Sequence, residues 1–166
     1  MQASADPRNR TKVVMGENGN SRGVAAHRAR RLTEKLMSAL IFHMIGGAPD
    51  PVAPFSHAVE ADGWAFLTGQ MPFTGTANDS TYPETIEAQT HQVMKNLRTV
   101  LEGCGLGLHH VAVVRVFLRH FDEHYGRMND VYATYFPSER RPARTCIGVN
   151  GLARGALIEI DMIARR

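Results

Sequence analysis

The chain has 166 residues, of which 43% are hydrophobic and 21% charged, a composition typical of a single globular domain. No apolar run approaches the roughly 18 residues that a membrane-spanning helix needs, so we expect no membrane partner. The two cysteines, Cys104 and Cys146, form no CxxC pair, so neither a zinc site nor a disulfide framework is indicated. We therefore expect no metal and a reducing, cytoplasmic location.

The net charge of +3 suggests a nucleic-acid-binding protein until the charges are located along the chain. Residues 1–45 contain eight basic and three acidic side chains and carry +5, which leaves −2 for residues 46–166. A nucleic-acid-binding domain normally has a basic face, so we expect no nucleic-acid partner.

The first 45 residues differ from the remainder. Residues 1–23 are polar, rich in Gly, Asn and Arg and without apolar periodicity, which predicts disorder. Residues 24–45 can form an amphipathic helix. An Arg-rich, acid-poor leader is either a targeting peptide or a dispensable extension, and we favour the extension. We expect residues 46–166 to form the folded domain, and a chain that starts near Met44 to fold and assemble normally.

Two strands and a helix follow. The segments 55–61 and 64–71 meet at Asp62-Gly63, a strong hairpin signal. A helix begins at Pro83 and Glu84, carries an apolar stripe to about residue 102, and is ended by glycines. The Gly-x-Gly-x-Gly pattern over 103–107 follows a helix rather than a strand, so we do not interpret it as a phosphate-binding loop.

The second half contains three strands and another helix. Residues 111–118 (VAVVRVFL) are apolar on both faces, as in a strand that is covered on both sides. Aromatic residues from Phe121 onwards mark a second helix, which ends before Pro137. Strands over 143–149 and 156–164 complete the chain.

The order β-β-α-β-α-β-β predicts an α+β fold in which one sheet has two helices on one face. Two helices cannot cover both faces, so the second face should be apolar and open. An open apolar face of this size usually binds a partner subunit. We expect this face to carry Val111, Val113, Phe117, Leu157 and Ile163.

The last two strands predict where the chemistry lies. The apolar residues Thr145, Ile147 and Val149 should face the helices, which leaves Arg144 and Cys146 on the other face. Antiparallel pairing with the final strand would place Cys146 opposite Glu159, and Arg144 opposite Asp161. Such a cluster is either an ion pair that holds subunits together or a site for a small anion. In such a site Arg144 would grip a carboxylate while Glu159 orients or deprotonates a water.

Five segments in order resemble the motifs of the RidA/YjgF family, also called L-PSP endoribonuclease-like proteins. They are PFSHAV (54–59), LTGQMP (67–72), MNDVYATYF (128–136), RPARTC (141–146) and IEIDMIA (158–164). The resemblance implies a chorismate-mutase-like fold, assembled as a homotrimer with clefts between subunits. It also implies a hydrolase that converts 2-imino and enamine acids to 2-oxo acids and ammonia without a cofactor.

The resemblance also assigns residues. Arg144 corresponds to the arginine that binds the substrate carboxylate, and Glu159 to the acid associated with the hydrolytic water. The other residues of the cleft are expected to be Cys146, Asn129, Phe55, Thr68 and Gly69. The family commonly has tyrosine at the position of Phe55 and serine at that of Thr68, which puts rate and substrate range in question more than carboxylate binding.

Several alternatives stay open beside this hypothesis. A non-catalytic trimer that only binds small carboxylates, or acts like a chaperone, would use the same fold. Cys146 as a nucleophile with His57 as base is a weaker candidate, and so is a metal site at His120 and His124. Cys104 is expected to be a core residue. The charge of −2 over residues 46–166 argues against RNA cleavage.

Overall fold

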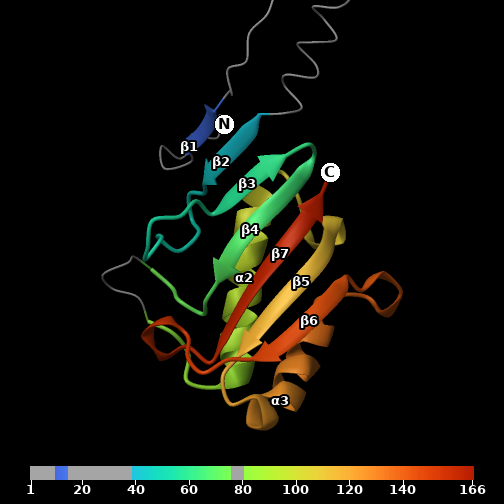
Figure 1. Cartoon of the computed structure of the whole chain (residues 1–166). Helices are drawn as coiled ribbons and strands as arrows, with labels where there is room; N and C mark the ends of the chain where they lie inside the picture. The colour runs from blue at the N-terminus through green and yellow to red at the C-terminus, as the bar shows by residue number, and fades with distance from the viewer. Residues whose placement is uncertain (1–9, 15–38, 76–80) are drawn as a thin grey trace, which may run out of the picture.

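The computed structural model of the protein describes residues 10–14, 39–75 and 81–166, which form one sheet with two helices packed on one face (Figure 1). The strands run in the order β1-β2-β3-β4-β7-β5-β6. Their bounds are β1 (Arg10–Val14), β2 (Leu40–Met44), β3 (Ala58–Ala61), β4 (Trp64–Gln70), β5 (Val111–Leu118), β6 (Ala143–Gly148) and β7 (Ile158–Arg165). The helices are α2 (Ile86–Gly103) and α3 (Phe121–Ala133). This is the predicted α+β architecture.

The predicted hairpin is confirmed at β3 and β4. Ala61 pairs with Trp64, and the two turn residues, Asp62 and Gly63, have φ angles of 51° and 79°. Two successive left-handed residues give the turn a twist that matches the flanking strands, and an Asp-Gly pair adopts this conformation readily. The hairpin therefore follows from local sequence alone.

Helix α2 is confirmed with bounds close to the predicted ones. The Thr85 hydroxyl accepts a hydrogen bond from the amide of Ala88 and caps the N-terminus. At the other end, Gly105 adopts a φ of 71° and the amide of Leu106 donates to the carbonyl of Leu101. This glycine-based cap satisfies carbonyls that the helix would otherwise leave unpaired.

The core lies between the sheet and the two helices. It contains one face of α2 and the alternate residues of β5 and β7 that point at the helices: Val93, Met94, Leu97, Val100, Leu101, Val114, Val116, Leu118, Ile158, Ile160 and Met162. Each is at most 1% exposed. No helix among the described residues is both long and apolar enough to cross a lipid bilayer.

The amino-terminal segment departs from the prediction. Leu40–Met44 is a strand rather than the end of a helix, and it pairs with β3 on one side and with β1 on the other. Arg10–Val14, expected to be disordered, is also a strand. The remainder of the predicted disordered segment and helix falls on residues 1–9 and 15–38, outside the described residues. Apolar residues in 40–44 fit either a helix or a strand, and pairing with β3 decides the outcome.

The predicted pairing of the last two strands is wrong. β6 pairs in parallel with β5 at the edge of the sheet, and β7 lies on the other side of β5, antiparallel to it. β5 therefore separates the two strands that we expected to be neighbours. The parallel register aligns Val114 with Arg144 and Val116 with Cys146.

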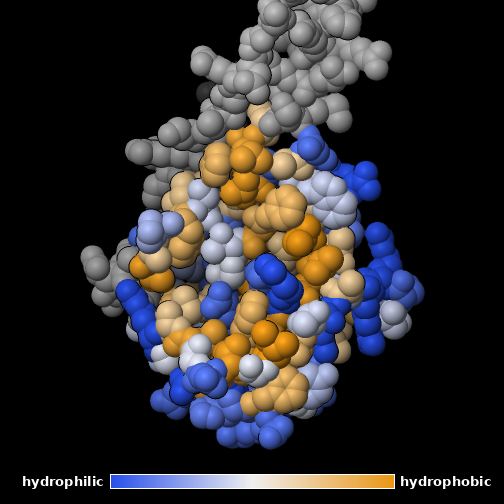
Figure 2. Space-filling model, viewed as in Figure 1, coloured by the Kyte–Doolittle hydropathy of each residue, from blue (hydrophilic) through white to orange (hydrophobic). Residues whose placement is uncertain are grey.

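No helix or strand within residues 10–14, 39–75 and 81–166 covers the other face of the sheet, as predicted. Phe117 and Ile163 lie on it, with Phe66 (46% exposed) and Ile147 (47% exposed) among its apolar residues. Of the five residues predicted here, Val111 and Leu157 instead pack against the core. Figure 2 views this face and shows hydrophobic side chains around a hydrophilic centre.

The position of β2 changes what a minimal domain should contain. We expect a chain of residues 39–166 to unfold in urea at a higher midpoint than one of residues 46–166. The shorter chain lacks β2 and also Ile45, whose side chain is 5% exposed and lies against Gly103. Burial of one such side chain stabilises by about 1.5–3 kcal/mol. Equal midpoints would show that the domain does begin at residue 46.

Candidate functional site

Arg144 lies on the helix side of the edge strand β6. It is aligned with the fully buried Val114, and aligned residues of neighbouring strands share a face. Its guanidinium carbon lies 4.7 Å from the centre of the Tyr132 ring, which α3 supplies. A cation over an aromatic face is held by the ring quadrupole, so Tyr132 orients Arg144 without neutralising it. Among the described residues, no carboxylate pairs with Arg144.

Cys146 shares this face, and Asn129 belongs to α3, the helix that packs against it. The Cys146 thiol packs against the core, and burial raises its pKa, an effect that the charge of Arg144 partly offsets. Helix α3 runs antiparallel to β6, with Phe121 against Gly148 at one end and Tyr132 against Arg144 at the other. Asn129 is half-buried and lies within one turn of Tyr132. We call Asn129, Arg144 and Cys146 the edge group.

A second set of predicted residues surrounds a bulge in β4. The register between β4 and β7 shifts between Leu67 and Gln70, which brings Gly69 against Glu159 of β7. A Cβ atom at Gly69 would overlap the Glu159 carboxylate, so only glycine fits without a shift. The bulge interrupts the pairing of β4 with β7, and it also positions the Glu159 carboxylate against Gly69.

Thr68 and Phe55 complete this set. The Thr68 hydroxyl donates a 2.6 Å hydrogen bond to the carbonyl of Ser56, and the Thr68 amide donates to the carbonyl of His57. Phe55 and Gly69 line a small pocket of about 20 Å³. We call Phe55, Thr68, Gly69 and Glu159 the bulge group.

Glu159 lies near a second carboxylate, that of Asp161, and has no cationic partner among the described residues. Among the described residues, none donates a hydrogen bond to its carboxylate or forms an ion pair with it. Burial raises the pKa of this carboxyl, and the charge of Asp161 raises it further. Asp161 itself is satisfied, because the Arg115 guanidinium binds both of its oxygens, at 2.8 and 2.7 Å. The fold thus keeps one carboxylate paired and the other without a partner.

The two groups lie on opposite faces of the sheet. Glu159 aligns with Phe117 on the open face, whereas Arg144 aligns with Val114 on the helix face. The prediction that Arg144 and Cys146 share a face with Glu159 and Asp161 is therefore wrong. The prediction of an ion pair from Arg144 to either acid fails for the same reason, and Arg115 is the partner of Asp161. Within one chain, the edge group and the bulge group are therefore separated by the sheet.

His57 is a structural residue. It is 3% exposed, its Nδ1 accepts a hydrogen bond from the Ile45 amide at 2.8 Å, and its Nε2 lies 2.9 Å from the Pro49 carbonyl. Because Nδ1 must accept, Nε2 carries the proton and donates to the carbonyl. Neither nitrogen is available as a base, so the hypothesis of a Cys146–His57 pair is wrong.

The remaining polar features lie away from both groups. A hollow of about 400 Å³ at the C-terminal ends of α2 and α3 contains none of the predicted site residues. The rings of His120 and His124 are 5.8 Å apart, and Glu123 lies 3.9 Å from His124, but these side chains do not converge into a metal-binding group within the described residues. A different trio, His43, Glu60 and Cys104, does converge.

The family profile described as Endoribonuclease L-PSP matches residues 45–166. The chain belongs to the RidA/YjgF/L-PSP family. A RutC family protein of Pyrococcus horikoshii is 38% identical over 117 residues, which cover 70% of this chain and 90% of that protein.

Solved structures of the family have the same fold. The yeast protein YEO7 superposes with a TM-score of 0.71 at 33% identity, over 76% of this chain and 98% of that one. RidA from an Antarctic Psychrobacter gives 0.67 at 28% identity, over 74% and 98%. The RidA-like fold therefore accounts for α2, α3 and most of the sheet.

The contact between Gly69 and Glu159 predicts a specific coupling. Gly69→Ala should lower the free energy of unfolding by about 0.5–1.5 kcal/mol, because the overlapping atoms belong to the flexible end of the Glu159 side chain, which must leave its position. The double variant with Glu159→Ala should recover most of this loss, since the overlapping carboxylate is gone. As a control, Gly126→Ala in α3, where a Cβ meets no atom within 4 Å, should stabilise by about 0.5–1 kcal/mol. Additive losses in the double variant would contradict the contact.

The raised pKa of Glu159 predicts a pH-dependent stability difference. A carboxyl whose pKa is raised on folding destabilises the folded chain once pH exceeds its ordinary value of 4.5, and the penalty disappears below that value. Glu159→Gln should therefore be more stable than the parent near pH 7, and no more stable near pH 4. Urea unfolding at equal protein concentration measures both. A variant that is less stable at neutral pH would contradict the assignment.

Proposed function

We propose that this protein is a homotrimeric hydrolase that deaminates reactive 2-imino and enamine acids, with a site built from the edge group of one subunit and the bulge group of its neighbour. The observation that carries the proposal is the complementary state of the two groups. Within the part of the chain that the structure describes, no carboxylate pairs with the edge-group cation Arg144, and no cation pairs with the bulge-group carboxylate Glu159. Each group is incomplete in one chain and would be completed by the other.

The open face supports assembly. Phe66 and Ile147 are nearly half exposed, and hydrophobic side chains surround a hydrophilic centre on this face (Figure 2). A monomer rarely leaves an apolar surface of this extent in water. A partner subunit on this face would cover the apolar area and bring a second chain to Glu159. The open face supports assembly but not a particular number of subunits, and the proposed number of three rests on the resemblance to the family.

The proposed chemistry uses each group once. Arg144 binds the substrate carboxylate through two charge-assisted hydrogen bonds. Water adds to the carbon of the C=N bond as Glu159 accepts one of its protons, and Glu159 returns this proton to the nitrogen to give a carbinolamine. The carbinolamine hydroxyl then loses its proton, by way of Glu159, to the nitrogen as the C=O bond forms, the C–N bond breaks and ammonia leaves. The products are a 2-oxo acid and ammonia. A carboxyl with a raised pKa both accepts and returns a proton more readily near neutral pH.

The other residues shape the cleft in this proposal. Cys146, with its raised pKa, is a neutral thiol and lines the site rather than attacking the substrate. Asn129 adds an amide beside Arg144, and Thr68 and Gly69 line the opposite wall with Phe55. We also propose a cytoplasmic location, because both cysteines are reduced.

A non-catalytic trimer that captures small carboxylates is the second candidate. Phe55 favours it, because the tyrosine that is common in the family would supply a hydroxyl that phenylalanine lacks. Turnover of the imine product of an amino-acid oxidase distinguishes the two candidates, since capture alone would not accelerate hydrolysis.

Substitution of Arg144 tests carboxylate binding. Removal of one partner of a hydrogen-bonded charge pair costs about 2–5 kcal/mol, so Arg144→Ala should lower kcat/KM by roughly two to three orders of magnitude. Arg144→Lys keeps the charge but loses the planar two-bond fork, so its kcat/KM should lie between those of the parent and of Arg144→Ala. Glu159→Gln should lower kcat more than affinity. Mass from light scattering, measured on the same samples, excludes loss of assembly as the cause. If Arg144→Ala oligomers of the parental mass kept the parental activity, Arg144 would not be the residue that binds the substrate carboxylate.

A mixing experiment tests the division of the site between subunits. Arg144→Ala and Glu159→Gln chains are each expected to be inactive alone. In randomly mixed trimers, about a quarter of the sites would join an intact Arg144 to a neighbour's intact Glu159, so activity should return to roughly a quarter of the parental value. If both residues acted within one chain, the mixture would stay inactive.

A further inference from the structure

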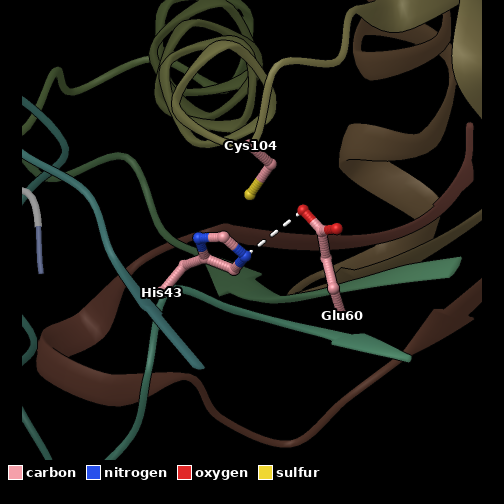
Figure 3. A group of neighbouring side chains, drawn as sticks. All are labelled: His43, Glu60 and Cys104. Atoms are coloured by element: carbon pink, nitrogen blue, oxygen red, sulfur yellow. Dashed lines mark ion pairs between the residues drawn. The ribbon is translucent and has the colours of Figure 1, made fainter. Parts of the chain in front are cut away.

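A buried polar cluster lies at the far end of β7 from Glu159. His43 comes from β2, Glu60 from β3, and Cys104 directly follows α2 (Figure 3). The three residues are 8%, 8% and 4% exposed, respectively. One nitrogen, oxygen or sulfur atom of each lies within 4.8 Å of the other two. These are the atom types that bind divalent transition metals.

The ring of His43 is incompletely satisfied. Its Nε2 is buried and lies 3.2 Å from the nearer Glu60 oxygen, yet it makes no hydrogen bond of acceptable geometry with any described residue. A buried polar atom without a partner costs about 1–3 kcal/mol, so such atoms usually mark a ligand or a function. In Figure 3 this nitrogen points at the carboxylate, with the Cys104 sulfur lying above both side chains.

We propose that His43 Nε2, one Glu60 oxygen and Cys104 Sγ bind a divalent transition-metal ion, Zn²⁺ being the best match to this donor set. Zn²⁺ accepts imidazole, carboxylate and thiolate together, with water in a fourth position. Bonds of about 2.0–2.3 Å in a tetrahedron separate the ligand atoms by roughly 3.3–3.8 Å. The nitrogen–oxygen distance of 3.2 Å is within about 0.1 Å of that range. The sulfur lies within 4.8 Å of both atoms and needs to move by about 1 Å at most.

Proton balance accompanies binding. Burial and the charge of Glu60 raise the pKa of the Cys104 thiol to about 11, so without metal the sulfur keeps its proton. The metal–sulfur bond forms as this proton leaves to solvent, and no electron is transferred. Metal affinity should therefore increase with pH.

Arg166 is the main competitor for Glu60. Its guanidinium donates to both carboxylate oxygens, at 3.0 and 3.2 Å, and to the Cys104 carbonyl at 2.6 Å. Each carboxylate oxygen has two lone pairs, so Glu60 can keep a hydrogen bond from Arg166 while it binds the ion. Hydrogen bonds of this kind orient carboxylate ligands in metal sites. The Arg166 side chain is about half exposed, so it can move to admit the ion.

The cluster does not follow from family membership. His43 precedes residue 45, where the match to the family profile begins. The trio therefore depends on β2, which lies outside the matched segment.

Cobalt titration of the full-length, metal-free protein tests the proposal. The chain has two cysteines, so a thiolate-to-cobalt charge-transfer band has two possible sources. We expect one equivalent of Co²⁺ per chain to give this band, and Zn²⁺ to abolish it by displacement. Cys104→Ser should remove the band, whereas the control Cys146→Ser should keep it with unchanged affinity. His43→Gln should raise the Kd at least about tenfold.

A thermal measurement provides a second readout if Cys104→Ser fails to fold. Zn²⁺ that binds only the folded chain should raise the Tm of the parent and of Cys146→Ser, but not that of His43→Gln. The proposal is overturned if the parent gives no band, if the band survives in Cys104→Ser, or if it is lost in Cys146→Ser. In those cases the trio is an ion-pair cluster around Glu60.

Discussion

The position of β5 between β6 and β7 determines where every candidate functional group lies. Its residues Val114, Val116 and Leu118 are fully buried beneath the helices, and its backbone hydrogen-bonds to both neighbouring strands. Since aligned residues share a face, Arg144 must follow Val114 to the helix side, and Glu159 must follow Phe117 to the open side. A function that needs both groups on one substrate therefore needs a second chain.

The same arrangement keeps the charges of the site unsatisfied. If β6 and β7 were neighbours, Arg144 and Asp161 could neutralise each other within one chain. Instead Arg115 of β5 binds Asp161 in a two-bond pair. Arg144 rests on Tyr132, and Glu159 is left beside a second negative charge. The fold accepts an electrostatic penalty at Glu159, as proteins commonly do at functional sites.

Local features of the fold were predictable, and long-range ones were not. The Asp62-Gly63 hairpin, the glycine end of α2 and the apolar strand 111–118 depend on residues close in sequence, which carry their own signals. Strand order depends on contacts between distant segments. Consecutive strands often pair, and that tendency misleads here because β7 pairs with β4 and β5. The alternation in β6 also gave the wrong orientation, because Ile147 lies on the open face, whereas Arg144 and Cys146 lie on the helix side.

The same contrast between local and long-range features applies to the proposed site. Each residue of the proposed site was assigned from its motif, but the Gly69–Glu159 contact arises from a bulge between two distant strands, and His43, Glu60 and Cys104 have no common sequence pattern. β7 connects the two regions, from Glu159 to Arg166, across about 23 Å at 3.3 Å per residue. At that distance a metal ion cannot touch a substrate held by Glu159. Its effect would be mechanical, because its three ligands would join β2, β3 and the end of α2. The amino-terminal strand that lies outside the family match would then be fixed to the fold that carries the site.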